Sequence, residues 1–137
     1  MRRVLLFLIF LLTQVAALAA DDALVVIGHS GLPKTDLPTL QRVYSGRAVS
    51  INQVAVVPLN LQPRDPLRQR FLALIMGQNE EQYTGYWLVR QYVGKGAPPE
   101  EVATVEVLLK YIMGTPGALG YLPASKVPAG SNVIYKQ

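Results

Sequence analysis

The sequence predicts one α/β domain with a mixed sheet flanked by helices. Two apolar runs, residues 24–27 and 54–59, are continuous rather than alternating, which is typical of strands buried on both faces. Segments with the apolar spacing of helices follow each run, and residues 118–122 and 132–135 form two final short strands. Strands that alternate with helices imply right-handed crossovers, so part of the sheet should be parallel.

The expected helices carry recognisable start signals. Asp36 caps the first, and Asp65 caps the second, with Pro66 in the first helical position. Asn79 caps the third, and Gln82 three residues later completes a capping-box pattern.

The sequence also predicts how the third helix is buried and where the fourth helix begins. The third is apolar nearly all round between residues 83 and 93, which predicts that it is well buried or covered by a neighbour, with Trp87 buried. An aromatic platform for a sugar or peptide is the alternative use of Trp87. Glu100 and Glu101 are expected in the first turn of the fourth helix, where acidic groups suit the helix dipole.

The first residues have the layout of a secretory signal peptide. Arg2 and Arg3 precede an apolar run from residue 4 to residue 12, and residues 17–19 supply the small side chains that signal peptidase reads. The run is shorter than the roughly 20 apolar residues of a membrane span, although an uncleaved anchor is the alternative. We expect residues 1–19 to be removed, residues 20–137 to form the domain, and the product to be periplasmic or secreted.

The sequence offers few groups for catalysis. It has 0 cysteines and 1 histidine, and no spacing of acidic residues indicates a metal site. We therefore expect neither an enzyme nor a cofactor. His29 follows a strand, so it either lines a ligand crevice or is a solvated turn residue.

The charge pattern argues against a nucleic-acid partner. The net charge is +4, and the basic residues are spread along the chain rather than gathered in a dense stripe. One local concentration, at Arg64, Arg68 and Arg70, suits a single small anion site.

Two loops are candidates for that anion site. Ser30 and Gly31 follow the first buried strand, whereas Arg64, Asp65 and Arg68 follow the second. If the two strands are adjacent and parallel, both loops lie at the same edge of the sheet, where α/β proteins bind ligands. Ser30 would donate a hydroxyl, and either arginine would donate charged N–H groups. The alternative is a helix capped by Asp65 with a solvated basic face.

Several blocks of the sequence resemble the phosphate-transporter substrate-binding proteins, and more closely the short bacterial proteins of that superfamily. They are residues 40–46, 65–71, 86–87, 94–99 and 115–121. The resemblance implies a single lobe of a type II periplasmic binding protein-like fold. Full-length members are two-lobed clamshells that hold phosphate in the cleft and deliver it to an ABC permease, and this chain looks like their second lobe.

The resemblance departs from the family pattern at the ligand. Full-length members open the phosphate-contacting helix with Ser-Gly-Thr, and the matching place here is Arg64-Asp65-Pro66-Leu67. The implied function is binding of phosphate or another small oxyanion in connection with ABC-type uptake. The alternative is a ligand-free lobe that binds an envelope protein, such as a sensor, as an interaction or regulatory domain. Two copies that pair face to face, as a homodimer, would restore a cleft, and only the signal peptide would contact the membrane.

Overall fold

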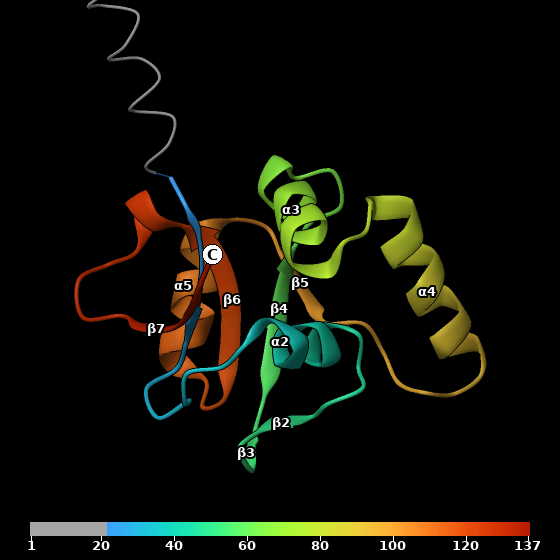
Figure 1. Cartoon of the computed structure of the whole chain (residues 1–137), viewed down its shortest axis with the longest axis horizontal. Coiled ribbons are helices and arrows are strands. Elements are labelled where there is room, and N and C mark those ends of the chain that lie inside the picture. Colours follow the sequence, from blue (N-terminus) through green and yellow to red (C-terminus); the bar gives the residue numbers. More distant parts are fainter. Residues whose placement is uncertain (1–21) are drawn as a thin grey trace, which may run out of the picture.

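The computed structural model describes residues 22–137, which form a five-stranded mixed sheet with helices on both faces (Figure 1). The predicted signal peptide lies outside the described residues. The strands are β1 (Leu24–Gly28), β2 (Ser50–Ile51), β3 (Val54–Ala55), β4 (Val57–Leu61), β5 (Glu100–Val102), β6 (Ala118–Pro123) and β7 (Asn132–Lys136). The helical elements are α2 (Leu37–Tyr44), α3 (Pro66–Phe71), the π-helical turn η1 (Leu72–Met76), α4 (Glu80–Tyr92), α5 (Val105–Gly114) and the 3₁₀ turn η2 (Ala124–Lys126).

The strand order in the sheet is β5-β4-β6-β1-β7. β4 is parallel to β5 and β6, whereas β1 is antiparallel to both of its neighbours, β6 and β7. The predicted mixed sheet is therefore confirmed. β1 and β4 are separated by β6 and run in opposite directions, so the expectation that the first two buried strands are adjacent and parallel is wrong.

The predicted strand at residues 54–59 is two elements. Val54 and Ala55 are exposed and pair with β2 in a separate hairpin, and the buried strand β4 begins at Val57. Asn52 and Gln53 adopt φ angles of 44° and 71°, the left-handed conformation of a tight hairpin turn. This turn reverses the chain just before the apolar run, so the first two residues of the run pair back onto β2.

Glu100 and Glu101 do not begin a helix. Both lie in β5, where they pair in parallel with Leu59 and Asn60 of β4. The helix α5 starts later, after Thr104, whose Oγ1 accepts a hydrogen bond from the Val107 N–H at 3.2 Å. Strand pairing with β4 therefore outweighs the preference of acidic residues for the first turn of a helix, on which the prediction was based.

The sheet is packed on both faces. Gly120 of β6 lies against Leu108 of α5, while its neighbour Tyr121 stacks on Phe71 of α3 with ring centroids 4.0 Å apart. Because successive strand residues point to opposite faces, α5 and α3 cover different sides of the sheet. Tyr44 of α2 packs on Phe71 at 4.6 Å, which joins α2 to the α3 side.

The helix α4 is less buried than predicted. Only its inner side is covered: Tyr83 and Trp87 are buried, and the Trp87 prediction is confirmed. Both side chains donate hydrogen bonds to the carbonyl oxygen of Tyr44, at 3.1 Å from Tyr83 and 3.2 Å from Trp87. Figure 1 shows α4 at one side of the domain, so aromatic contacts with the end of α2 hold it in place.

Candidate functional site

The parallel strands define one edge of the sheet as the candidate site. Leu61 of β4 is in register with Val102 of β5, so residues 62–65 and 103–104, which follow them, lie side by side. We call these two segments the carboxyl-end edge. Open α/β sheets bind ligands beyond the carboxyl ends of their strands, which makes this edge the place to test for a ligand.

Arg68 lies beneath this edge and is fully engaged. Its Nε and Nη2 atoms donate to both carboxylate oxygens of Glu80 at 2.9 and 2.7 Å. Its Nη1 atom donates to Glu101 at 2.8 Å and to the Leu61 carbonyl oxygen at 2.9 Å. The arginine side chain is 5% exposed, whereas the side chains of Glu80 and Glu101 are 23% and 38% exposed, so a buried cation is held by two partly exposed carboxylates. Such a cluster holds α3, α4 and β5 together and does not favour an added anion.

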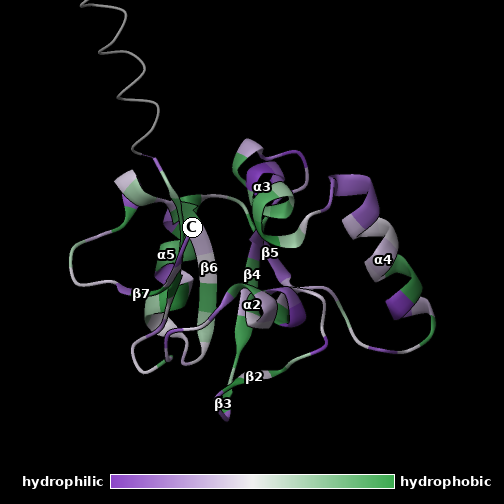
Figure 2. Ribbon diagram, in the orientation of Figure 1, coloured by the Kyte–Doolittle hydropathy of each residue, from purple (hydrophilic) through white to green (hydrophobic). Residues whose placement is uncertain are grey.

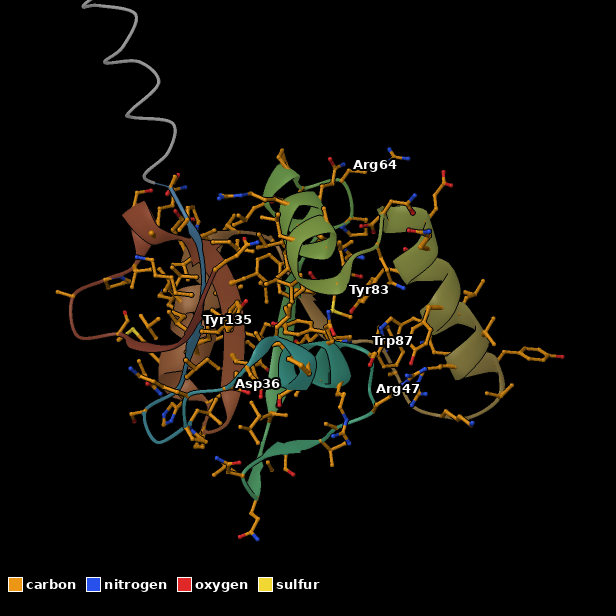
Figure 3. All side chains as sticks on the ribbon, in the orientation of Figure 1. Asp36, Arg47, Arg64, Tyr83, Trp87 and Tyr135 are labelled. Atoms are coloured by element: carbon orange, nitrogen blue, oxygen red, sulfur yellow. The ribbon has the colours of Figure 1, made fainter. Side chains whose placement is uncertain are left out.

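Asp65 and Arg64 have different environments. Asp65 Oδ1 accepts the backbone N–H of Leu67 at 2.9 Å, which confirms the predicted cap of α3. Arg64 is exposed and has a left-handed φ of 73°. Figure 3 shows its side chain extending from the loop into solvent. Of the two predicted arginine contacts, Arg64 is the exposed one.

Ser30 and Gly31 lie at the opposite edge of the sheet. Gly28, at the end of β1, pairs with Leu119 near the start of β6 and with Asn132 at the start of β7. The predicted meeting of this loop with Arg64 and Arg68 is therefore wrong, because β1 runs against β4. Whether either loop binds an anion by itself stays a prediction.

The Ser30 loop borders a cavity of its own, of about 270 Å³. His29 and Ser30 line it together with Asn132, whose side chain donates to the carbonyl oxygens of His29 and Leu32 at 3.0 and 2.9 Å. His29 lines this cavity and also lies in an exposed turn, so a ligand-binding role for it stays a prediction. The rest of the lining is largely apolar, and His29 Nδ1 lies 2.9 Å from the neighbouring Ser30 carbonyl oxygen.

A second, smaller cavity of about 120 Å³ lies between α4 and the carboxyl-end edge. Asn60, Tyr83 and Glu101 line it beside Arg68 and Trp87. Burial raises the pKa of the Tyr83 phenol to about 12, so this group stays a neutral donor at ordinary pH. The predicted strand ended at residue 59, which left Asn60 in the candidate anion loop that follows. Asn60 lies instead inside β4, where it is buried.

The part of the chain that the structure describes shows neither a candidate metal centre nor a helix that could span a membrane. Residues 22–137 contain no group of three or more His, Asp or Glu residues placed to hold a metal ion. No helix among the same residues is long and apolar enough to cross a bilayer.

The fold matches a single lobe of a PstS-like fold. No model of a known protein family matches the chain, and a search of curated proteins finds no significant match. Solved structures match in fold. An ABC-type phosphate transport receptor from Vibrio cholerae superposes with a TM-score of 0.64 at 14% identity, covering 82% of this chain and 45% of that one.

Two further solved structures match this chain in fold. A putative phosphate ABC transporter substrate-binding protein with bound phosphate, from Clostridium perfringens, gives a TM-score of 0.64 at 16% identity, with 82% and 44% of the two chains covered. PstS from Borrelia burgdorferi gives 0.61 at 13% identity, with 82% and 46% covered. This chain therefore has a PstS-like fold, as the sequence resemblance implied, and spans less than half the length of each of these receptors.

Proposed function

We propose that this protein is a non-catalytic binding lobe that works outside the cytoplasm and takes phosphate or another small oxyanion at its carboxyl-end edge. The observation that carries the proposal is the match of its fold to one lobe of phosphate receptors. A link to ABC-type uptake follows from the same likeness. The proposal agrees with the lack of cysteine and the single histidine in the sequence.

Arg64 is the contact that we assign to the anion. Its guanidinium is exposed at the edge, whereas the donors of Arg68 already bind Glu80 and Glu101. The first turn of α5 follows residues 103–104 of the same edge, and free N–H groups at a helix start attract anions.

Asp65 works against tight binding. Its carboxylate sits on the start of α3 and repels an anion held by the neighbouring Arg64. An open edge also leaves water to compete for the ligand. We expect a dissociation constant of micromolar or weaker, which is about −8 kcal/mol or less in magnitude. A second protein surface over the edge would exclude that water and strengthen binding.

A second candidate function is an interaction lobe without a small ligand. The neutralisation of Arg68 by two carboxylates favours it, because the most buried cation near the edge is then a structural residue. The partner would be an envelope protein, such as a permease or a sensor.

Calorimetric titration of the purified protein with phosphate and sulfate separates the two functions. Oxyanion binding predicts saturable heat that Arg64→Ala removes and Asp65→Ser increases, because the serine replaces a competing carboxylate by a hydroxyl. Arg47→Ala, which removes an exposed arginine from another loop, is the matched control. Absence of heat at millimolar anion would reject the oxyanion function and leave the interaction lobe.

A further inference from the structure

The outer face of α4 is apolar. Leu88, Val89, Tyr92 and Val93 are exposed by 66%, 63%, 92% and 55%. Val89 and Tyr92 lie on the side of the helix away from Tyr83 and Trp87, as a repeat of about 3.6 residues per turn requires, and Leu88 and Val93 flank them. Figure 2 shows this apolar band in the second half of α4. A contiguous group of exposed large apolar side chains marks an interaction surface more often than isolated ones do.

Gly85 interrupts the same face two turns before Tyr92. A Cβ placed on it would meet no atom within 4 Å, so the backbone there is open to solvent. Glycine inside a helix costs about 1 kcal/mol relative to alanine, and nothing within the domain requires a bare backbone at this position. The gap beside Leu88 can take a large side chain from another surface.

We propose that a second copy of this chain covers the outer face of α4, with the two helices antiparallel about a twofold axis between Leu88 and Val89. Twofold pairing of a surface with itself requires that every projection have its own recess in the same patch. Tyr92 and Gly85 lie at equal distances along the sequence on either side of that axis. The ring of Tyr92 from each copy then lies over Gly85 of the other, and Leu88 meets Val89.

The charges at the two ends of the helix support the antiparallel direction. Glu81 is exposed in the first turn, and Lys95 is exposed just beyond the last. Antiparallel pairing brings Glu81 of each copy towards Lys95 of the other, whereas parallel pairing would set like charges side by side. It also places opposite ends of the two helix dipoles together.

This pairing differs from a face-to-face closure of the carboxyl-end edge. It uses the exposed side of α4 rather than the loops that follow β4 and β5, and it stands whether or not an anion binds. The patch comprises one helix from each copy, so we expect a weak dimer that dissociates on dilution.

Sedimentation velocity of the purified protein over a micromolar to millimolar series tests the proposal. We expect a monomer–dimer equilibrium that Tyr92→Ala and Leu88→Glu weaken by about tenfold or more. Met113→Glu, at an apolar residue of α5 that is 76% exposed, should leave the equilibrium unchanged. A protein that is monomeric throughout the series, or a dimer that survives both α4 variants, would overturn the proposal.

Three more single variants and one double variant distinguish this interface from a change in folding. Gly85→Leu should raise the melting temperature of the dilute monomer, because it improves helix propensity, and yet weaken the dimer by blocking the seat of Tyr92. Glu81→Lys and Lys95→Glu should each weaken the dimer, and the double swap should restore it. Failure of the double swap to restore association rejects the antiparallel arrangement.

Binding of the monomer to anionic phospholipid vesicles through Leu88, without self-association, would assign the face to a membrane surface instead.

Discussion

Glu80 binds the guanidinium of Arg68 through both carboxylate oxygens, at 2.7 and 2.9 Å. The two residues join the start of α4 to α3, and Glu101 of β5 adds a third contact at 2.8 Å. This arrangement makes Arg68 a structural residue.

Removal of Arg68 should therefore destabilise the protein. Arg68→Ala leaves two carboxylates near a buried site without their cation, and we expect a loss of about 3–5 kcal/mol of unfolding free energy. Urea denaturation followed by circular dichroism measures it. Arg64→Ala, at an exposed position, should change stability by no more than about 0.5 kcal/mol. Equal effects of the two substitutions would contradict the structural role.

Trp87 should be a main anchor of α4. Its indole is 4% exposed and lies over Gly46, where a Cβ would approach the ring to 2.5 Å. Trp87→Ala should cost about 3–5 kcal/mol, because a large buried ring leaves a cavity. Tyr92→Ala, on the outer face of the same helix, is the control, tested at concentrations where the protein is monomeric. A denaturant midpoint of Trp87→Ala close to that of the control would return Trp87 to the alternative role of a binding platform.

The stability of the protein should fall at alkaline pH in a way that depends on Tyr83. A tyrosine in the unfolded chain ionises near pH 10, whereas burial raises the pKa of Tyr83 to about 12 in the fold. The stabilisation is present below pH 10 and is lost as the pH rises from 10 to 12. Tyr83→Phe should flatten this decline in denaturation experiments, and Tyr92→Phe should not. An unchanged slope in Tyr83→Phe would show that other buried groups cause the decline.

Export should leave a protein that begins at Ala20 or Asp21. The small residues at positions 17–19 and the acidic start beyond them motivate this prediction. Intact-mass analysis of the protein recovered from the periplasm is the measurement. A species that retains Arg2 and Arg3 would mean that residues 1–19 stay attached.

Local sequence signals predicted the ends of most elements. Asp36, Asp65 and Asn79 cap helices as expected, because each makes its hydrogen bond within three residues of itself. Glu101 was misplaced because its position in β5 depends on pairing with β4, which lies far away in the sequence. Non-local pairing of this kind leaves no periodic signal.

The candidate site was predicted less well for the same reason. Ser30 and Arg64 were assigned to one edge on the assumption that β1 and β4 are parallel neighbours, and strand direction is set by how β6 inserts between them. The ion pairs of Arg68 were also invisible, since Glu80 and Glu101 come from separate elements. The spread of apolar residues on α4 suggested burial, but one side of it faces solvent.

Titration of ¹⁵N-labelled protein with phosphate, followed by amide chemical shifts, tests the proposed binding function most directly. The account predicts saturable shifts confined to the carboxyl-end edge and to the first residues of α3 and α5 that follow it, 66–67 and 105–106, and their loss in Arg64→Ala. Shifts centred on residues 28–31 instead, or no shift at millimolar phosphate, would contradict the proposed oxyanion site.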